Sequence, residues 1–142
     1  MFKILVAVDG SDNALRAIDF VIRQAPHYKD EIEIHLLNVQ LPVASGAVTR
    51  FVGRSDLDRY YQDEGATTLA SARQRLDTAG LSCHHHICVG NYAEIIVAFA
   101  KEKSCDMIVM GARGLGSVAG ILLGSVAARV TQLSPLPVLI VK

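Results

Sequence analysis

The sequence predicts an α/β fold of the Rossmann-like kind, with a five-stranded parallel sheet in the order 3-2-1-4-5 and helices on both faces. The chain has 142 residues, a length typical of one domain. Short apolar runs alternate with amphipathic segments from one end of the chain to the other. Strands separated by helices require right-handed crossovers, which build a parallel sheet between two helical layers. We therefore expect a single domain over residues 1–142.

The first strand is predicted at residues 2–8, which are nearly all apolar, as in strands buried on both faces. An Asp-Gly pair ends it, and Ser11 is a favourable N-cap for a helix whose apolar positions recur until Pro26. The second strand is expected at residues 31–39. Residues 41–56 contain proline and glycine and show no clear period, so they predict a long loop.

The second half of the chain continues the alternation. A helix is predicted at residues 57–79, followed by Gly80, where a helix end favours a left-handed residue. Residues 82–89 predict a polar third strand. Asn91 with Glu94 three residues later resembles a capping box for the next helix. The last three elements are a strand, a helix and a strand, at residues 106–110, 125–133 and 138–141.

The strand order follows from polarity. The third strand carries three histidines and two cysteines, which suit an edge better than the centre of a sheet, whereas the first and fourth strands are the most apolar. This pattern favours the order 3-2-1-4-5, in which the chain reverses direction between strands 1 and 4. In open parallel sheets, ligands bind beyond the carboxyl ends of the strands at that reversal. Asp9 and Gly111 follow the two strands there.

Composition excludes several classes of function. Fourteen Lys and Arg balance 14 Asp and Glu, with no basic stripe, so we expect no nucleic-acid binding. The apolar runs are far shorter than the roughly 20 residues that a membrane-spanning helix needs, so we expect no membrane insertion. The amino-terminal residues do not form a signal-peptide pattern. We therefore expect a cytoplasmic protein.

Cysteines and histidines leave two alternatives open. Cys83, Cys88 and Cys105 contain no C-x-x-C spacing and suit reduced core or strand residues, with a disulfide or thiolate site as the alternative. In a strand, His84 and His86 share one face, while the histidine between them points away. An exposed polar strand face is favoured over a metal site there, because no acidic residue is near in sequence.

Residues 111–125 form the strongest candidate for a ligand-binding segment, with five of the chain's 11 glycines between a buried strand and a helix. Glycines let backbone N–H groups approach a ligand, and a helix N-terminus adds partial positive charge. Phosphate binding is therefore favoured over a flexible turn packed under the sheet. The Walker pattern G-x-x-x-x-G-K-[ST] is absent, and the spacing of Gly114, Gly116 and Gly120 is one residue too long for a dinucleotide fingerprint.

Residues 6–11, 36–39 and 108–114 resemble the universal stress protein family. The resemblance covers essentially the whole chain and includes the closing residues 137–141. The nucleotide-binding branch of that family has the spacing G-x2-G-x9-G followed by Ser or Thr. This sequence matches that spacing with Gly111, Gly114, Gly124 and Ser125.

The resemblance implies an ATP-binding, stress-linked regulatory protein, usually a homodimer. ATP or AMP would be the ligand. A single arginine does not neutralise a triphosphate, so Mg²⁺ or Mn²⁺ would be carried by the nucleotide. Asp9 and Val39 would hold the adenosine end, beside Ala7, where some family members have proline. By position, the residues flanking the ligand and lining the phosphates would be Met110, Gly111, Arg113, Gly114, Gly124, Ser125 and Val126.

Alternatives remain for individual residues and for the function. Asp9 is either a ribose-binding carboxylate or a turn residue before Ser11, and Arg113 is either a phosphate ligand or a surface arginine. The pocket could support slow ATP hydrolysis, with Asp9 or His35 positioning water, or could be vestigial in an interaction module. The apolar last strand, 138–141, is followed by the single charge of Lys142 and predicts a homodimer through that edge.

Overall fold

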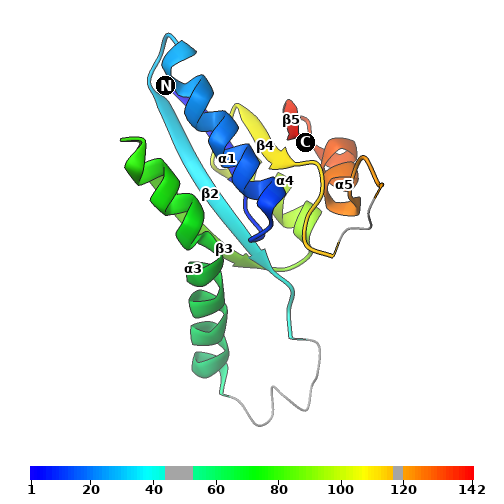
Figure 1. The fold of residues 1–142 in the computed structure, drawn as a ribbon. Coiled ribbons are helices and arrows are strands. Elements are labelled where there is room, and N and C mark those ends of the chain that lie inside the picture. Colours follow the sequence, from blue (N-terminus) through cyan, green and yellow to red (C-terminus); the bar gives the residue numbers. More distant parts are fainter. Residues whose placement is uncertain (44–52, 117–119) are drawn as a thin grey trace.

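The computed structural model describes residues 1–43, 53–116 and 120–142. Its five strands are all parallel and run in the order β3-β2-β1-β4-β5. The strands are β1 (Phe2–Ala7), β2 (Ile32–Gln40), β3 (Cys83–Val89), β4 (Met107–Gly111) and β5 (Val138–Val141). The predicted fold class and strand order are therefore confirmed, and β3 is an edge strand as its polarity indicated (Figure 1).

Helices cover both faces of the sheet. They are α1 (Asp12–Gln24), extended by the short 3-10 helix η1 (Ala25–His27), α3 (Arg54–Thr78), α4 (Tyr92–Glu102) and α5 (Ser125–Leu133). Helices α1 and α3 lie on one face of the sheet, and α4 and α5 lie on the other (Figure 1). Within the described ranges, no helix is both long and apolar enough to cross a membrane.

The local signals for helix ends were mostly correct. The Ser11 hydroxyl accepts the Ala14 N–H at 3.2 Å and caps α1 as predicted. Gly80 has φ +73°, the left-handed conformation expected after a helix. Asn91 precedes α4, but its side chain makes no cap hydrogen bond, so the predicted capping box does not form. Helix α3 begins at Arg54, which makes the last residues of the predicted loop helical, and residues 44–52 of that loop lie outside the described ranges.

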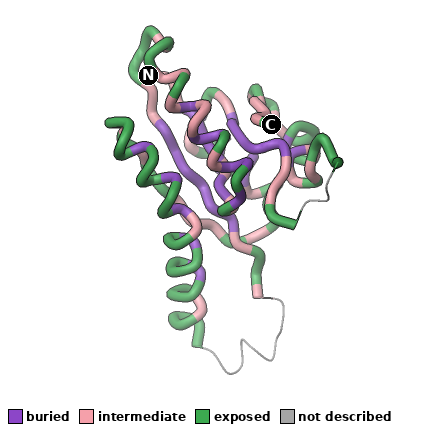
Figure 2. Tube along the Cα trace, viewed as in Figure 1, coloured by how far each residue is buried: buried purple, intermediate pink, exposed green. Residues whose placement is uncertain are grey.

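The core is divided by the sheet into two clusters. In β1, Ile4 and Val6 pack with α1 and α3, whereas Leu5 between them packs with α4 and α5. All three side chains are at most 1% exposed, and burying each contributes about 1.5–3 kcal/mol. The central strands are buried along most of their length, while the part of α3 that projects beyond the sheet is mostly exposed (Figure 2). Burial on both faces explains why the first strand lacks an alternating pattern.

The three cysteine thiols are free in the structure. Burial raises the pKa of Cys83, Cys88 and Cys105 above the ordinary thiol value. Because the thiolate is the reactive form, raised pKa values make these side chains poor nucleophiles at neutral pH. The geometry therefore favours their interpretation as packing residues.

Candidate nucleotide-binding site

A cavity of about 690 Å³ opens at the carboxyl ends of β1 and β4, within the range of about 300–1,000 Å³ typical of small-molecule sites. It lies where the chain reverses direction between these two strands, as the strand order predicted. The structure brings all the residues that the sequence analysis assigned to nucleotide binding to this one cavity. They are Ala7, Asp9, Val39, Met110, Gly111, Arg113, Gly114, Gly124, Ser125 and Val126.

Asp9 joins two distant parts of the cavity wall. Its Oδ1 accepts the N–H of Ser11 at 2.9 Å and so shapes the turn before α1. Its Oδ2 accepts the N–H of Leu115 at 3.1 Å and so fixes the glycine-rich segment that follows β4. The carboxylate therefore acts as a turn residue, as one reading of the sequence held, and also anchors the loop on the opposite wall.

Two glycines of this loop are required by close packing. A Cβ on Gly114 would overlap Oδ2 of Asp9, and a Cβ on Gly111 would lie 2.8 Å from the backbone carbonyl carbon of Asn13. Gly116 has φ +73° and Gly120 has φ +88°, so these two positions need glycine for their backbone conformation instead. The glycines thus bring the loop against β1 and α1, and leave its backbone at the cavity surface.

The end of the loop presents the start of a helix to the cavity. The Gly124 N–H donates to the Ala112 carbonyl at 2.7 Å, which closes the loop on itself. The Gly124 carbonyl accepts the N–H of Ala128 at 2.9 Å and begins the hydrogen-bond ladder of α5. The first N–H groups of α5, starting at Ser125, therefore have no partner within the helix, and they carry its partial positive charge. Such a helix start is suited to an anion.

The opposite wall comes from the end of β2. Asn38 is only 3% exposed, and its Nδ2 donates to the Val8 carbonyl at 2.9 Å. Its Oδ1 accepts from Nε2 of Gln40 at 2.5 Å. These contacts hold the end of β2 beside the end of β1, with Val39 between two polar residues that also line the cavity.

Several lining residues were missed by the sequence reasoning, among them Asn38, Gln40, Thr68 and Tyr92. Asn38 had a sequence signal that could have been used, because an amide that follows the apolar pair Leu36 and Leu37 in a strand must find hydrogen-bond partners. Thr68 and Tyr92 had none, since they reach the cavity only through the packing of α3 and α4 on the sheet.

Few charged side chains line the cavity. Among the described residues they are Asp9, Glu64 and Arg113, of which Arg113 is half-buried. One cation beside two carboxylates gives no side-chain excess of positive charge for a polyanion. A phosphate group placed here would therefore depend on backbone N–H groups and on the helix start.

Two other sequence candidates lie elsewhere. His35 does not line the cavity, because it contacts Glu33 and His86 on β2 and β3. It is therefore not placed to position water at this site. Over residues 1–43, 53–116 and 120–142, no group of three or more His, Cys, Asp or Glu side chains has an arrangement able to hold a metal ion.

Comparison with known proteins agrees with the fold. The family model of the universal stress protein family matches residues 1–142. Universal stress protein YxiE of Bacillus subtilis is 32% identical over 145 residues, covering 99% of this chain and 98% of that protein. The solved structure of MJ0577 from Methanocaldococcus jannaschii matches with a TM-score of 0.84 at 30% identity, over 99% of this chain and 95% of that one.

Two further solved structures contain nucleotides. A universal stress protein in complex with cAMP matches with a TM-score of 0.70 at 29% identity, over 99% of this chain and 95% of that one. The universal stress protein of Archaeoglobus fulgidus in complex with dAMP matches with a TM-score of 0.70 at 26% identity, over 100% and 98% of the two chains. With its family model matched from the first residue to the last, the chain belongs to the universal stress protein family.

Proposed function

We propose that this protein binds an adenine nucleotide, ATP or AMP, in the cavity at the ends of β1 and β4, and acts as a cytoplasmic, nucleotide-dependent regulator of the stress response. The observation that carries the proposal is the convergence of the family's glycine spacing, the start of α5 and the Asp9 carboxylate on one cavity. Nucleotide complexes of two similar family members support the same ligand class.

Each part of the nucleotide has a suitable environment. The apolar side chains of Val39, Met110 and Ile96 offer a surface for the base. The Asp9 carboxylate has lone pairs beyond those used by its two backbone partners and accepts a hydrogen bond from ribose. The phosphates lie against the glycine loop and the first N–H groups of α5, which begin at Ser125.

A divalent ion fits this proposal as part of the ligand. The lining side chains supply no excess positive charge, and no three-ligand metal group is present among the described residues. Mg²⁺ or Mn²⁺ would therefore be held chiefly by the phosphates, which is common for Mg²⁺ with nucleotides. ATP should consequently depend on the metal for affinity more than AMP does.

Binding is favoured over hydrolysis by the placement of the acid–base groups. Of the two residues considered for positioning water, His35 lies outside the cavity lining. Both Asp9 oxygens already accept backbone N–H groups, which orients the carboxylate toward the loop. We therefore propose regulation through nucleotide occupancy of the loop rather than through turnover.

Calorimetry with ATP, AMP, cAMP and dAMP, with and without Mg²⁺, tests the ligand and the role of Asp9. We expect AMP to bind more tightly than dAMP, because dAMP lacks the 2′-hydroxyl that would donate a hydrogen bond to the Asp9 carboxylate. In Asp9→Asn this preference should shrink, since a neutral amide oxygen is a weaker acceptor. Absence of heat with all four nucleotides would refute the proposal. An unchanged AMP preference in Asp9→Asn would refute only the ribose contact.

We also propose a homodimer through β5. In the described chain β5 pairs with β4 alone. The carbonyl of Pro137, just before β5, accepts the N–H of Ile108, and the carbonyl of Val141 accepts the N–H of Ala112. The alternation of a strand therefore turns the Ile140 N–H toward the open edge. Ile140→Pro removes this outward donor and spares the ladder to β4. Light scattering should show a dimer for the parent and a monomer for the variant, and a monomeric parent would refute the proposal.

A further inference from the structure

Two of the three histidines of β3 form part of a cluster that the nucleotide site does not use. Glu33 and His35 come from β2, and His84 and His86 come from β3. The parallel register places His35 directly beside His84, and residues two apart in a strand share a face. None of the four side chains lines the nucleotide cavity, and they lie nearer the amino end of β2. We call Glu33, His35, His84 and His86 the histidine cluster.

Both ring nitrogens of His35 are engaged. Its Nε2 lies 2.6 Å from Oε1 of Glu33, and its Nδ1 lies 3.0 Å from Nε2 of His86. The ring of His35 also stacks with the rings of His84 and His86, and the ring centroids are 5.1 Å and 5.2 Å apart, respectively. His35 is only 6% exposed, so water does not readily replace these partners.

The hydrogen bonds that link Glu33, His35 and His86 limit how many protons these three side chains can hold. An ionised carboxylate accepts only, so Nε2 of His35 carries the hydrogen that points to Glu33. A single hydrogen fits between His35 Nδ1 and His86 Nε2. His86 donates it when both rings are neutral, and His35 donates it when His35 is the cation. If both rings were cations, two N–H groups would face each other across 3.0 Å with no acceptor between them.

The charges around the pair oppose a second proton. Lys3 of β1 places its Nζ 4.0 Å from Glu33 and donates to the Lys103 carbonyl at 3.4 Å. Lys103, at the end of α4, lies with its ammonium group 5.6 Å from the centre of the Phe99 ring, which packs 4.6 Å from the ring of His86. Among the described residues, the other titratable groups beside the His35–His86 pair are His84 and His85 on β3 and, after α4, Cys105 and Asp106. Glu33 is thus the acidic side chain in direct contact with the pair.

We propose that Glu33, His35 and His86 form a proton-binding site that holds one proton between the two rings and is broken by a second, so that acidification loosens the edge strand β3 from β2. The site is separate from the proposed nucleotide function and does not rest on it. Its structural output is local, because β3 has β2 as its sole strand neighbour in the described sheet.

The electrostatics agree in sign with this geometry. The pKa of His86 lies below its ordinary value, first because burial penalises the cation and then because of His35 and Lys103. The unfolded chain therefore takes up a proton at a higher pH than folded His86 does. The contribution of His86 to the free energy of unfolding therefore falls as the pH drops below about 6.5, the ordinary histidine value.

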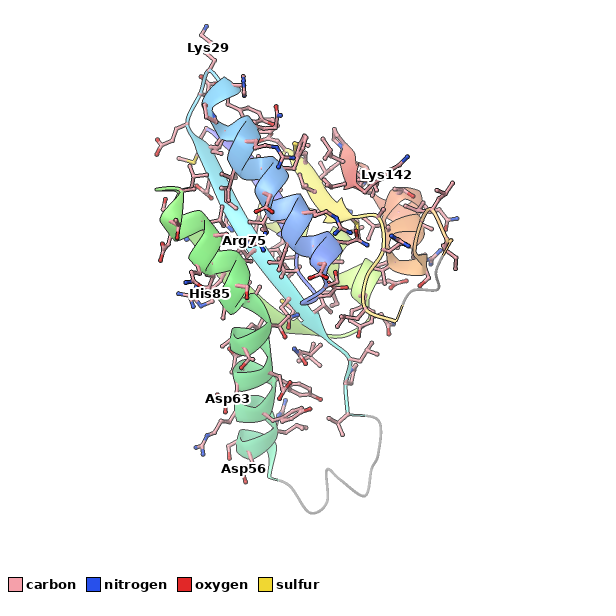
Figure 3. The ribbon with its side chains drawn as sticks, viewed as in Figure 1. Lys29, Asp56, Asp63, Arg75, His85 and Lys142 are labelled. Atoms are coloured by element: carbon pink, nitrogen blue, oxygen red, sulfur yellow. The ribbon has the colours of Figure 1, made fainter. Side chains whose placement is uncertain are left out.

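Thermal unfolding of the nucleotide-free protein at pH about 7.5 and about 5.5 tests the site. The parent melting temperature should fall by several degrees, and His86→Gln should lose much of that fall, because the amide still donates to His35 but takes up no proton. His85→Gln is the matched control. Figure 3 shows His85 beside α3. Its register partner Leu36 belongs to the core cluster under α1 and α3, on the face of the sheet opposite to His35. Equal falls in all three proteins, or the same rescue by His85→Gln, would overturn the proposal.

A second measurement needs no variant. The ring nitrogens of the parent, followed by NMR during a pH titration, should show one shared proton between His35 and His86 at neutral pH. Charging of the second ring should coincide with faster hydrogen exchange of β3 amides relative to those of β5. Independent charging of both rings while β3 amides keep their protection would overturn the proposal even if His86→Gln failed to fold.

Discussion

The two sites at opposite ends of the sheet are formed by different kinds of chemical group. At the carboxyl ends of β1 and β4, the cavity is shaped by backbone groups, glycines and a helix start. Toward the amino end of β2, the histidine cluster is made of side chains that contact one another directly. The first region should be sensitive to the volume of added side chains and the second to the protonation of existing ones. Four substitutions test that difference.

Gly114→Val should have the largest effect. A Cβ at this position overlaps Oδ2 of Asp9, so the variant must break the contact from Asp9 to Leu115 and move the loop. We expect ATP affinity to fall at least tenfold, or about 1.4 kcal/mol, in calorimetry with Mg²⁺. Gly53→Val is a matched control, because among the described residues the nearest atom that a Cβ there would meet is Oδ2 of Asp56 at 3.7 Å, and Gly53 lies outside the cavity lining. A folded Gly114→Val protein with parental affinity would place the phosphates elsewhere.

Gly124→Val should weaken ATP by a smaller factor. A Cβ at Gly124 would lie 3.4 Å from the Ala112 carbonyl oxygen, which is tight contact rather than overlap. The added methyl groups should still crowd the first turn of α5 and partly cover its free N–H groups. The melting temperature, measured beside the affinity, separates this local effect from loss of the fold. A stronger loss than in Gly114→Val would show that the helix start matters more than the anchoring by Asp9.

Arg113→Ala should cost less than either glycine substitution. Arg113 is half-buried at the cavity wall, and a partly exposed charge contact contributes about 1 kcal/mol or less. Titration at low and high salt provides the control, since the small Arg113 contribution should shrink as screening increases. If Arg113→Ala weakened ATP more than both glycine variants, charge rather than backbone geometry would hold the phosphates.

His86→Gln should leave ATP affinity unchanged at neutral pH. His86 is not in the cavity lining, and its partners are His35 and Phe99. The same variant should show a weaker dependence of the melting temperature on pH, so it distinguishes the function of the histidine cluster from that of the nucleotide cavity. A fall in ATP affinity comparable to that of Gly114→Val would mean that the two regions are energetically coupled.

Much of the site was accessible from the sequence because its signals are local. Strand ends, glycine spacing and the Ser that begins a helix are signals over a few neighbouring residues. The residues that these signals and the family resemblance indicated line one cavity. The contribution of α3 and α4 was not accessible, since Thr68 and Tyr92 belong to helices whose own patterns indicate only packing. The capping box at Asn91 failed for a related reason, because a sequence pattern permits a side-chain contact without enforcing it.

By itself, the sequence determined the order of elements, the buried strands and the position of the reversal, because hydrophobic period and turn residues act over short distances. Tertiary structure alone decided which side chains meet across the sheet. Asp9 reaches the N–H of Leu115, 106 positions along the chain, because β1 and β4 are neighbours. His35 meets His86 because β2 and β3 pair in one particular register, and a shift by one residue would turn these rings to opposite faces.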